Sequence, residues 1–182
     1  MKKFMCIAAL MVIGVLCVSC ASIDPKEEYR VLYKITETQS TSVNGALVRS
    51  VMPFFRDSEY AAAIECSMDA RTRSFMLTVV YIYDMKNDDK DNYRLNSVDI
   101  KIDNGRAITP AVTGQKQEYE KAVFNAKQME TITLRLEDST VQSLRNCNSL
   151  TLILLGQTRE MTQEALGKIK GFIEKYARIA LG

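Results

Sequence analysis

The stretch of residues 74–83 constrains the fold of this chain more than any other feature. Its side chains alternate between two faces, and both faces are largely apolar. Phe75, Leu77 and Val79 lie on one face, and the other face carries Met76, Val80 and Ile82. A strand with two apolar faces requires cover on both sides. We therefore predict that residues 74–83 form a central strand of a sheet.

Other period-two patterns predict further strands at residues 29–35, 46–52, 58–68, 95–103, 122–126, 130–136 and 150–155. Alanines 61–63 make the segment 58–68 compatible with a helix as well, but we favour a strand. Two Asn-Gly pairs, at residues 44–45 and 104–105, indicate tight hairpin turns. We expect the strand 46–52 to end at Pro53. The segment 114–121 is polar, and we assign no strand to it.

The chain ends with an amphipathic helix, predicted over residues 162–180 with Thr162 as its N-cap. Gly167 and Gly171 are expected to let this helix lie close to a sheet. A short helical turn capped by Asp138 or Ser139 should bury the apolar residues that follow it. These elements together predict an α+β fold: a mostly antiparallel, two-layer, sandwich-like β-rich domain with the C-terminal helix packed on it.

The first 19 residues have the features of an export signal. Lys2 and Lys3 precede an apolar run at residues 4–18 that is too short to span a membrane comfortably. Ser19-Cys20 then resembles the end of the lipobox of bacterial lipoproteins. This resemblance implies cleavage before Cys20 and acylation of that cysteine, which would anchor the chain to a membrane. Residues 20–28 would be the lipidated tether, and residues 29–182 a single domain.

Two alternatives concern the destination of the chain. Ala21, directly after the modified cysteine, is similar to residues of lipoproteins that are sorted to the outer membrane. Conventional secretion or a periplasmic location is the alternative, with Cys17 and Ser19 as the small residues of an ordinary cleavage site.

Cys66 and Cys147 are the two thiols that remain after cleavage and lipidation. In an oxidising compartment they could form a disulfide. The alternative is that both are small, buried apolar side chains.

Three groups of residues are candidate binding sites. Asn87, Asp89 and Asp91 have the spacing of the first calcium ligands in a calcium-binding loop, but we favour a solvated hairpin tip. Arg71 and Arg73 could bind an anion, or belong to a solvated turn. The third group is a set of tyrosines that could form a recognition surface or the rim of the core: Tyr29, Tyr33, Tyr60, Tyr81, Tyr83 and Tyr93.

Composition limits the function. The chain contains no histidine, which excludes the common histidine-dependent catalytic and metal sites. Beyond the signal, acidic and basic residues are balanced, which argues against a nucleic-acid binder. We expect no catalytic residues, metal or cofactor. The sequence favours a non-catalytic envelope lipoprotein that engages a protein or glycan partner. The alternative is a secreted or periplasmic carrier of a small ligand.

Overall fold

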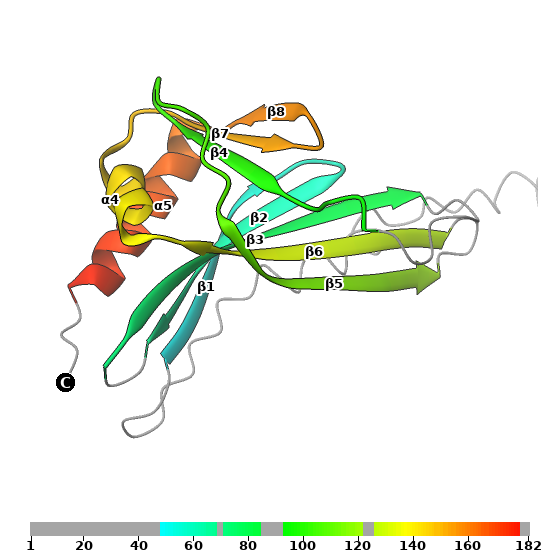
Figure 1. Cartoon of the computed structure of the whole chain (residues 1–182), viewed down its shortest axis with the longest axis horizontal. Helices are drawn as coiled ribbons and strands as arrows, with labels where there is room; N and C mark the ends of the chain where they lie inside the picture. Colours follow the sequence, from blue (N-terminus) through cyan, green and yellow to red (C-terminus); the bar gives the residue numbers. More distant parts are fainter. Residues whose placement is uncertain (1–47, 69–70, 85–92, 122–125, 179–182) are drawn as a thin grey trace, which may run out of the picture. The chain divides into compact units, whose positions relative to one another are not determined.

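The computed structural model describes residues 48–68, 71–84, 93–121 and 126–178 (Figure 1). Strands alternate with two helices in the order β1 (Val48–Arg56), β2 (Tyr60–Met68), β3 (Arg73–Asp84), β4 (Val98–Ile102), β5 (Ala111–Lys121), β6 (Ala126–Leu136), α4 (Asp138–Asn146), β7 (Leu150–Leu154), β8 (Gln157–Glu160) and α5 (Gln163–Ala177).

The larger sheet is fully antiparallel, with the strand order β1-β2-β3-β6-β5. The predicted central strand is β3, which pairs with β2 on one side and with β6 on the other. β2 confirms the strand interpretation of residues 58–68. Its alanines lie opposite residues 78–80 of β3, and they are fully buried. The small side chains at these positions therefore pack in the sheet, and the segment is a strand and not a helix.

The smaller sheet has the order β4-β7-β8 and is also antiparallel. β7 is its central strand, as the apolar pattern of residues 150–155 predicts. Leu155 leaves the strand with a positive φ of 51° and, with Gly156 at 76°, turns the chain into β8. β8 is absent from the sequence prediction because its four residues are mostly exposed and show no alternation.

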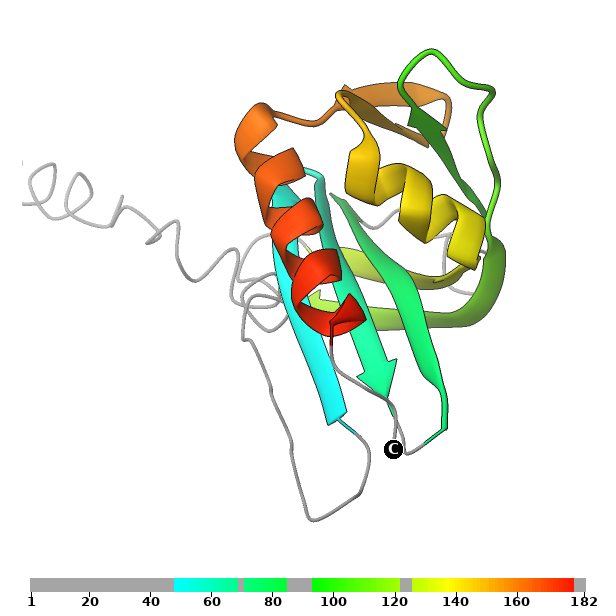
Figure 2. The ribbon, with the colours of Figure 1, turned by 90° about the vertical axis from the view of Figure 1, so that its left-hand side faces the viewer.

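One apolar core joins both sheets and both helices, which confirms the predicted α+β, sandwich-like class. The larger sheet contributes alternate residues of β2, β3 and β6, and the smaller sheet contributes the inward residues of β4 and β7. Figure 2 shows α4 and α5 beside the sheets. The most completely buried large side chains come from all these layers: Tyr60, Ile64, Leu95, Ile100, Ile132, Leu134, Leu152, Leu154, Leu166, Ile169 and Ile173.

The two helices agree with the sequence in their buried faces and differ in their ends. Val141 and Leu144 of α4 are buried as expected, but Glu137 is the N-cap residue and makes no side-chain capping bond. In α5 the Oγ1 atom of Thr162 accepts a hydrogen bond from the N–H of Ala165, at 3.2 Å, as predicted. Among the described residues, no helix is long and apolar enough to cross a membrane.

Two strand predictions are wrong at the edges of the larger sheet. β1 continues past Pro53 to Arg56, which is possible because β1 is an edge strand and its register shifts between Pro53 and Phe55. The polar segment 114–121 belongs to β5. This edge strand is exposed over residues 111–116, so it carries no apolar alternation. The predicted strand 29–35, the turn 44–45 and most of the strand 122–126 lie outside the described residues.

A buried carboxylate fixes the segment that leads into β4. Glu130 of β6 is 1% exposed. It accepts hydrogen bonds from the hydroxyl of Tyr83 at 2.6 Å and from the N–H groups of Arg94 and Leu95 at 2.8 and 2.7 Å. The side-chain amide of Gln117, on β5, donates at 3.3 Å. One side chain of the larger sheet thereby holds the chain that enters the smaller sheet.

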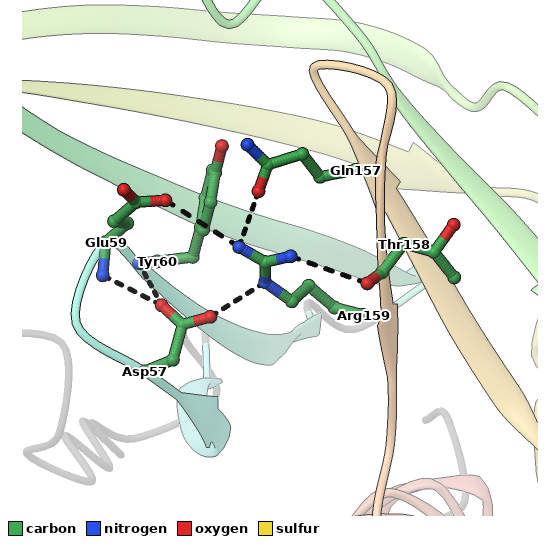
Figure 3. Close-up of polar contacts among 6 residues, drawn as sticks. All are labelled: Asp57, Glu59, Tyr60, Gln157, Thr158 and Arg159. Atoms are coloured by element: carbon green, nitrogen blue, oxygen red, sulfur yellow. Dashed lines mark hydrogen bonds and ion pairs between the residues drawn. The ribbon is translucent and has the colours of Figure 1, made fainter.

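A second polar cluster joins the β1–β2 turn to β8 (Figure 3). The Oδ1 atom of Asp57 accepts the N–H groups of Glu59 and Tyr60, at 2.8 and 2.7 Å. Its Oδ2 atom accepts the Nε–H of Arg159 at 2.8 Å. The same guanidinium donates to the Oε1 atom of Gln157 at 2.6 Å and lies 5.2 Å from the centre of the Tyr60 ring. Arg159 thus connects the two sheets at a site about one quarter exposed.

The expected close approach of α5 to a sheet through Gly167 and Gly171 is wrong. Both glycines are exposed, and a Cβ atom added at either would meet no atom within 4 Å. Replacing each by alanine should raise the free energy of unfolding by about 1 kcal/mol, because glycine weakens a helix interior by that amount. Urea denaturation of the purified protein measures the change.

Gly156 provides the matched control. Its φ of 76° disfavours any side chain, so Gly156→Ala should lower the free energy of unfolding by about 1 kcal/mol although it too has open space around it. Equal effects at all three positions would contradict this account.

Glu130→Gln should lower the free energy of unfolding by about 1–3 kcal/mol. The new amide NH₂ group would face hydrogen-bond donors, so buried polar groups would lose their acceptor. The half-exposed Glu118, which pairs with Lys116, is the control: Glu118→Gln should change stability by less than about 0.5 kcal/mol. Equal urea midpoints for the two variants would show that the acceptor role of Glu130 contributes nothing.

Candidate binding groove

An open groove of about 600 Å³ lies between α4 and the chain that follows β4. Figure 2 shows this chain, in green, running beside the yellow helix α4 before it enters β5. Sites that bind small molecules or peptide side chains commonly have volumes of a few hundred to about 1,000 Å³. The groove is therefore large enough for a ligand.

The first wall of the groove is a short hairpin that begins where β4 ends. The N–H of Gly105 donates to the carbonyl of Ile102 at 3.0 Å and closes a turn whose central residues are Asp103, with a positive φ of 50°, and Asn104. The chain turns where the sequence predicts, but the predicted hairpin turn with Asn104 and Gly105 at its centre is wrong. A Cβ atom at Gly105 would lie 3.0 Å from that carbonyl oxygen, so the turn favours glycine there. The returning arm pairs with β4 at one residue: Ile108 and Ile100 exchange two backbone hydrogen bonds of 2.8 Å.

Asp103 holds this turn against the connection between α4 and β7. Its Oδ1 atom accepts the N–H groups of Asn148 and Ser149, at 2.7 and 2.8 Å, and its own N–H donates to the carbonyl of Ser149 at 3.0 Å. The hydrogen bonds from these backbone amides lower the pKa of Asp103. Its carboxylate is therefore charged and already engaged within the fold.

The second wall is the polar face of α4, with Gln142, Ser143 and Asn146. The opposite face of the helix is buried in the core. Ser143 Oγ donates to the carbonyl of Ser139 at 2.9 Å, and Asn146 Nδ2 donates to the carbonyl of Gln142 at 3.2 Å. Among the described residues, the side-chain amide of Gln142 forms no hydrogen bond, so it is available to a ligand.

A second cavity, lined by core residues of both sheets and both helices, has a volume of about 10 Å³, less than a ligand needs. Side chains fill the space between the layers, as in most protein interiors. In the described part of the chain, the groove is therefore the better candidate for binding.

The structure places Arg71 and Arg73 apart from the groove. Arg73 donates from Nη1 to the carbonyl of Ala177 at 3.2 Å, which satisfies a carbonyl group at the C-terminal end of α5. Arg71 is exposed in the turn before β3. This contact gives Arg73 a structural role, and the anion site stays a prediction.

The candidate calcium ligands Asn87, Asp89 and Asp91 lie outside the described residues. Within the described ranges, no group of three or more potential metal ligands comes together.

Three of the predicted tyrosines form a stack at the edge of the core. The rings of Tyr60 and Tyr81, and those of Tyr81 and Tyr83, stack with centroids 4.8 Å apart. Arg94 lies 4.2 Å from the centre of the Tyr83 ring and continues the stack at one end. Burial raises the pKa of Tyr60 to about 12. The stack is part of the packing, while Tyr93 is partly buried and Tyr29 and Tyr33 lie outside the described residues.

The disulfide between Cys66 and Cys147 is not formed in the structure. Both are free cysteines in the core. Burial raises the pKa of the Cys66 thiol to about 11 and also raises that of Cys147, whose Sγ–H donates to the carbonyl of Leu144 at 3.2 Å. Both thiols are consequently protonated at neutral pH, in agreement with the second of the two sequence alternatives.

Sequence reasoning missed the groove itself. The Asn104-Gly105 turn was its one local signal, because the groove forms only when α4 packs beside a turn about 40 residues earlier in the chain. Comparisons with known proteins add no assignment: no family model, curated protein or solved structure matches this chain.

The state of the two cysteines gives a direct test. In the folded protein at about pH 8, iodoacetamide should modify neither Cys66 nor Cys147, because each is buried and protonated. After unfolding without reductant, peptide mass mapping should find both modified. If modification after unfolding needs a reductant, the two residues form a disulfide instead.

Proposed function

We propose that this chain is a bacterial envelope lipoprotein, anchored through Cys20, whose described domain binds a partner protein in the groove beside α4. The groove is the observation that carries the binding part of the proposal, because it combines a volume of about 600 Å³ with uncommitted polar and apolar groups. The lipobox-like Ser19-Cys20 supports the anchor.

The small volume of the core cavity favours this function over that of a small-ligand carrier. A carrier would need an enclosed apolar cavity of roughly 300 Å³ or more. The cavity lined by core residues of both sheets and both helices has a volume of about 10 Å³. The open geometry of the groove suits a ligand that remains attached to a larger molecule, such as a segment of a protein.

Intact mass spectrometry of the protein extracted from its native membranes tests the anchor. We expect a chain that begins at Cys20 and carries diacylglyceryl and acyl groups, because two or more acyl chains give stable membrane binding. Cys20→Ala should abolish the lipid mass and release the protein from the membrane fraction. Cys17→Ala is the matched control and should leave the lipid in place.

A photoreactive residue at Gln142 then tests the groove in cells, and the same residue at the exposed Gly171 of α5 is its control. We expect a cross-linked partner from position 142 and none from position 171. An unlipidated wild-type chain would overturn the anchor, and equal cross-linking at both positions would overturn the groove as the binding site.

A further inference from the structure

Residues 107–109 present an unpaired strand edge beside the groove. Ile108 directs both its N–H and its carbonyl to Ile100 of β4. Neighbouring residues of an extended chain direct these groups to opposite sides. The peptide groups of Ala107 and Thr109 therefore point away from β4, and they form no backbone hydrogen bond with any described residue. Both residues are exposed.

An exposed edge of this kind is a template for another strand. An added strand receives backbone hydrogen bonds from the edge, while pockets for alternate side chains provide specificity. Here the added strand would extend the smaller sheet beyond β4. The hydroxyl of Thr109 is already hydrogen-bonded to Asp99, so this end of the edge is fixed before a partner arrives.

The charge of the groove specifies the partner further. Arg106 lines the groove and forms no ion pair or hydrogen bond within the described part of the chain. Asp103 is the acidic residue of the lining, but its Oδ1 atom already accepts hydrogen bonds from two backbone N–H groups. The charged group that remains available to a ligand is therefore the guanidinium of Arg106, which can bind a carboxylate.

The apolar groups of the groove fit a side chain next to that carboxylate. Ile108 is 40% exposed, one of three large apolar residues exposed to this degree in the described ranges. Ile102 is also part of the lining. A strand that places an acid near Arg106 could cover Ile108 with an apolar residue and reach the free amide of Gln142.

We propose that the groove binds an extended segment of a partner protein, which pairs with the backbone of Ala107 and Thr109 and places a carboxylate side chain on Arg106. This inference rests on the proposed function and names the chemistry of its partner. A second copy of the chain fits less well, because it would bring a second Arg106 to the same place.

The test uses fluorescence anisotropy with the purified lipidated protein in detergent. The probe is a labelled octapeptide of alternating threonine and valine with one central aspartate, compared with its asparagine analogue. We expect the aspartate peptide to bind about twofold to fivefold more tightly, a usual range for one exposed charge pair. Arg106→Gln should remove this difference. Lys101→Gln, at an exposed position on β4 outside the groove, should preserve it.

Strand pairing is tested separately. Ala107→Pro removes the outward N–H and should weaken both peptides about tenfold, while the N–H of Ile108, which bonds to β4, remains. A peptide N-methylated at alternate residues tests the same pairing on the unmodified protein, and it should bind at least tenfold more weakly.

Three results would overturn the proposal: no saturable binding of either peptide, an equal effect of Arg106→Gln on both peptides, or undiminished binding of the N-methylated peptide. Self-association that depends on Arg106 would identify a second copy as the occupant and also overturn it. If lipidation and cross-linking from position 142 persist in these cases, the proposed function stands and only the partner chemistry fails.

Discussion

The carboxylate of Glu130 lies where the apolar core meets a polar cluster. The arrangement of the two sheets depends on the hydrogen bonds that this carboxylate accepts. The two oxygens of a carboxylate can each accept more than one hydrogen bond, so one carboxylate can satisfy several donors at once. Here those donors come from β3, β5 and the segment before β4. Buried polar clusters of this kind are costly when incomplete, but they specify one geometry when every donor is satisfied. The path of the chain into the smaller sheet follows from this single acceptor.

The consequences of that anchoring extend to the groove. Once residues 94–95 are held against β6, β4 begins three residues later and runs beside β7. The turn at Asp103 then meets the connection after α4 through two short hydrogen bonds. Arg159 fixes the other end of the smaller sheet to the β1–β2 turn. The open groove is thus bounded by walls that the buried contacts of Glu130, the partly buried contact of Arg159 and the exposed hydrogen bonds of Asp103 hold in place.

The sequence predicted those parts of the fold in which one face is buried. β3, β7 and α5 have strong periodicity because alternate or helically spaced side chains enter the core. β5 and β8 escaped prediction because edge strands bury little and need no alternation. The glycines of α5 were misinterpreted since a sequence does not show which face of a helix is open. Glu130 was missed for a different reason: its donors Leu95 and Tyr83 lie 35 and 47 residues away, and no local pattern encodes that meeting.

The contrast between two exposed edges supports a selective role for residues 107–109. β5 is a longer edge, but a bulge between Val112 and Gly114 interrupts it and the charged Lys116 and Glu118 follow. Bulges and charges on an edge deter pairing with other chains. The edge at Ala107 and Thr109 lies beside a single positive charge, that of Arg106. Such an edge discourages a second copy with the same charge but accepts a strand with the opposite one. β5 is therefore protected against strand pairing, whereas residues 107–109 are open to it. This difference favours selective pairing at one edge over nonspecific association of exposed strands.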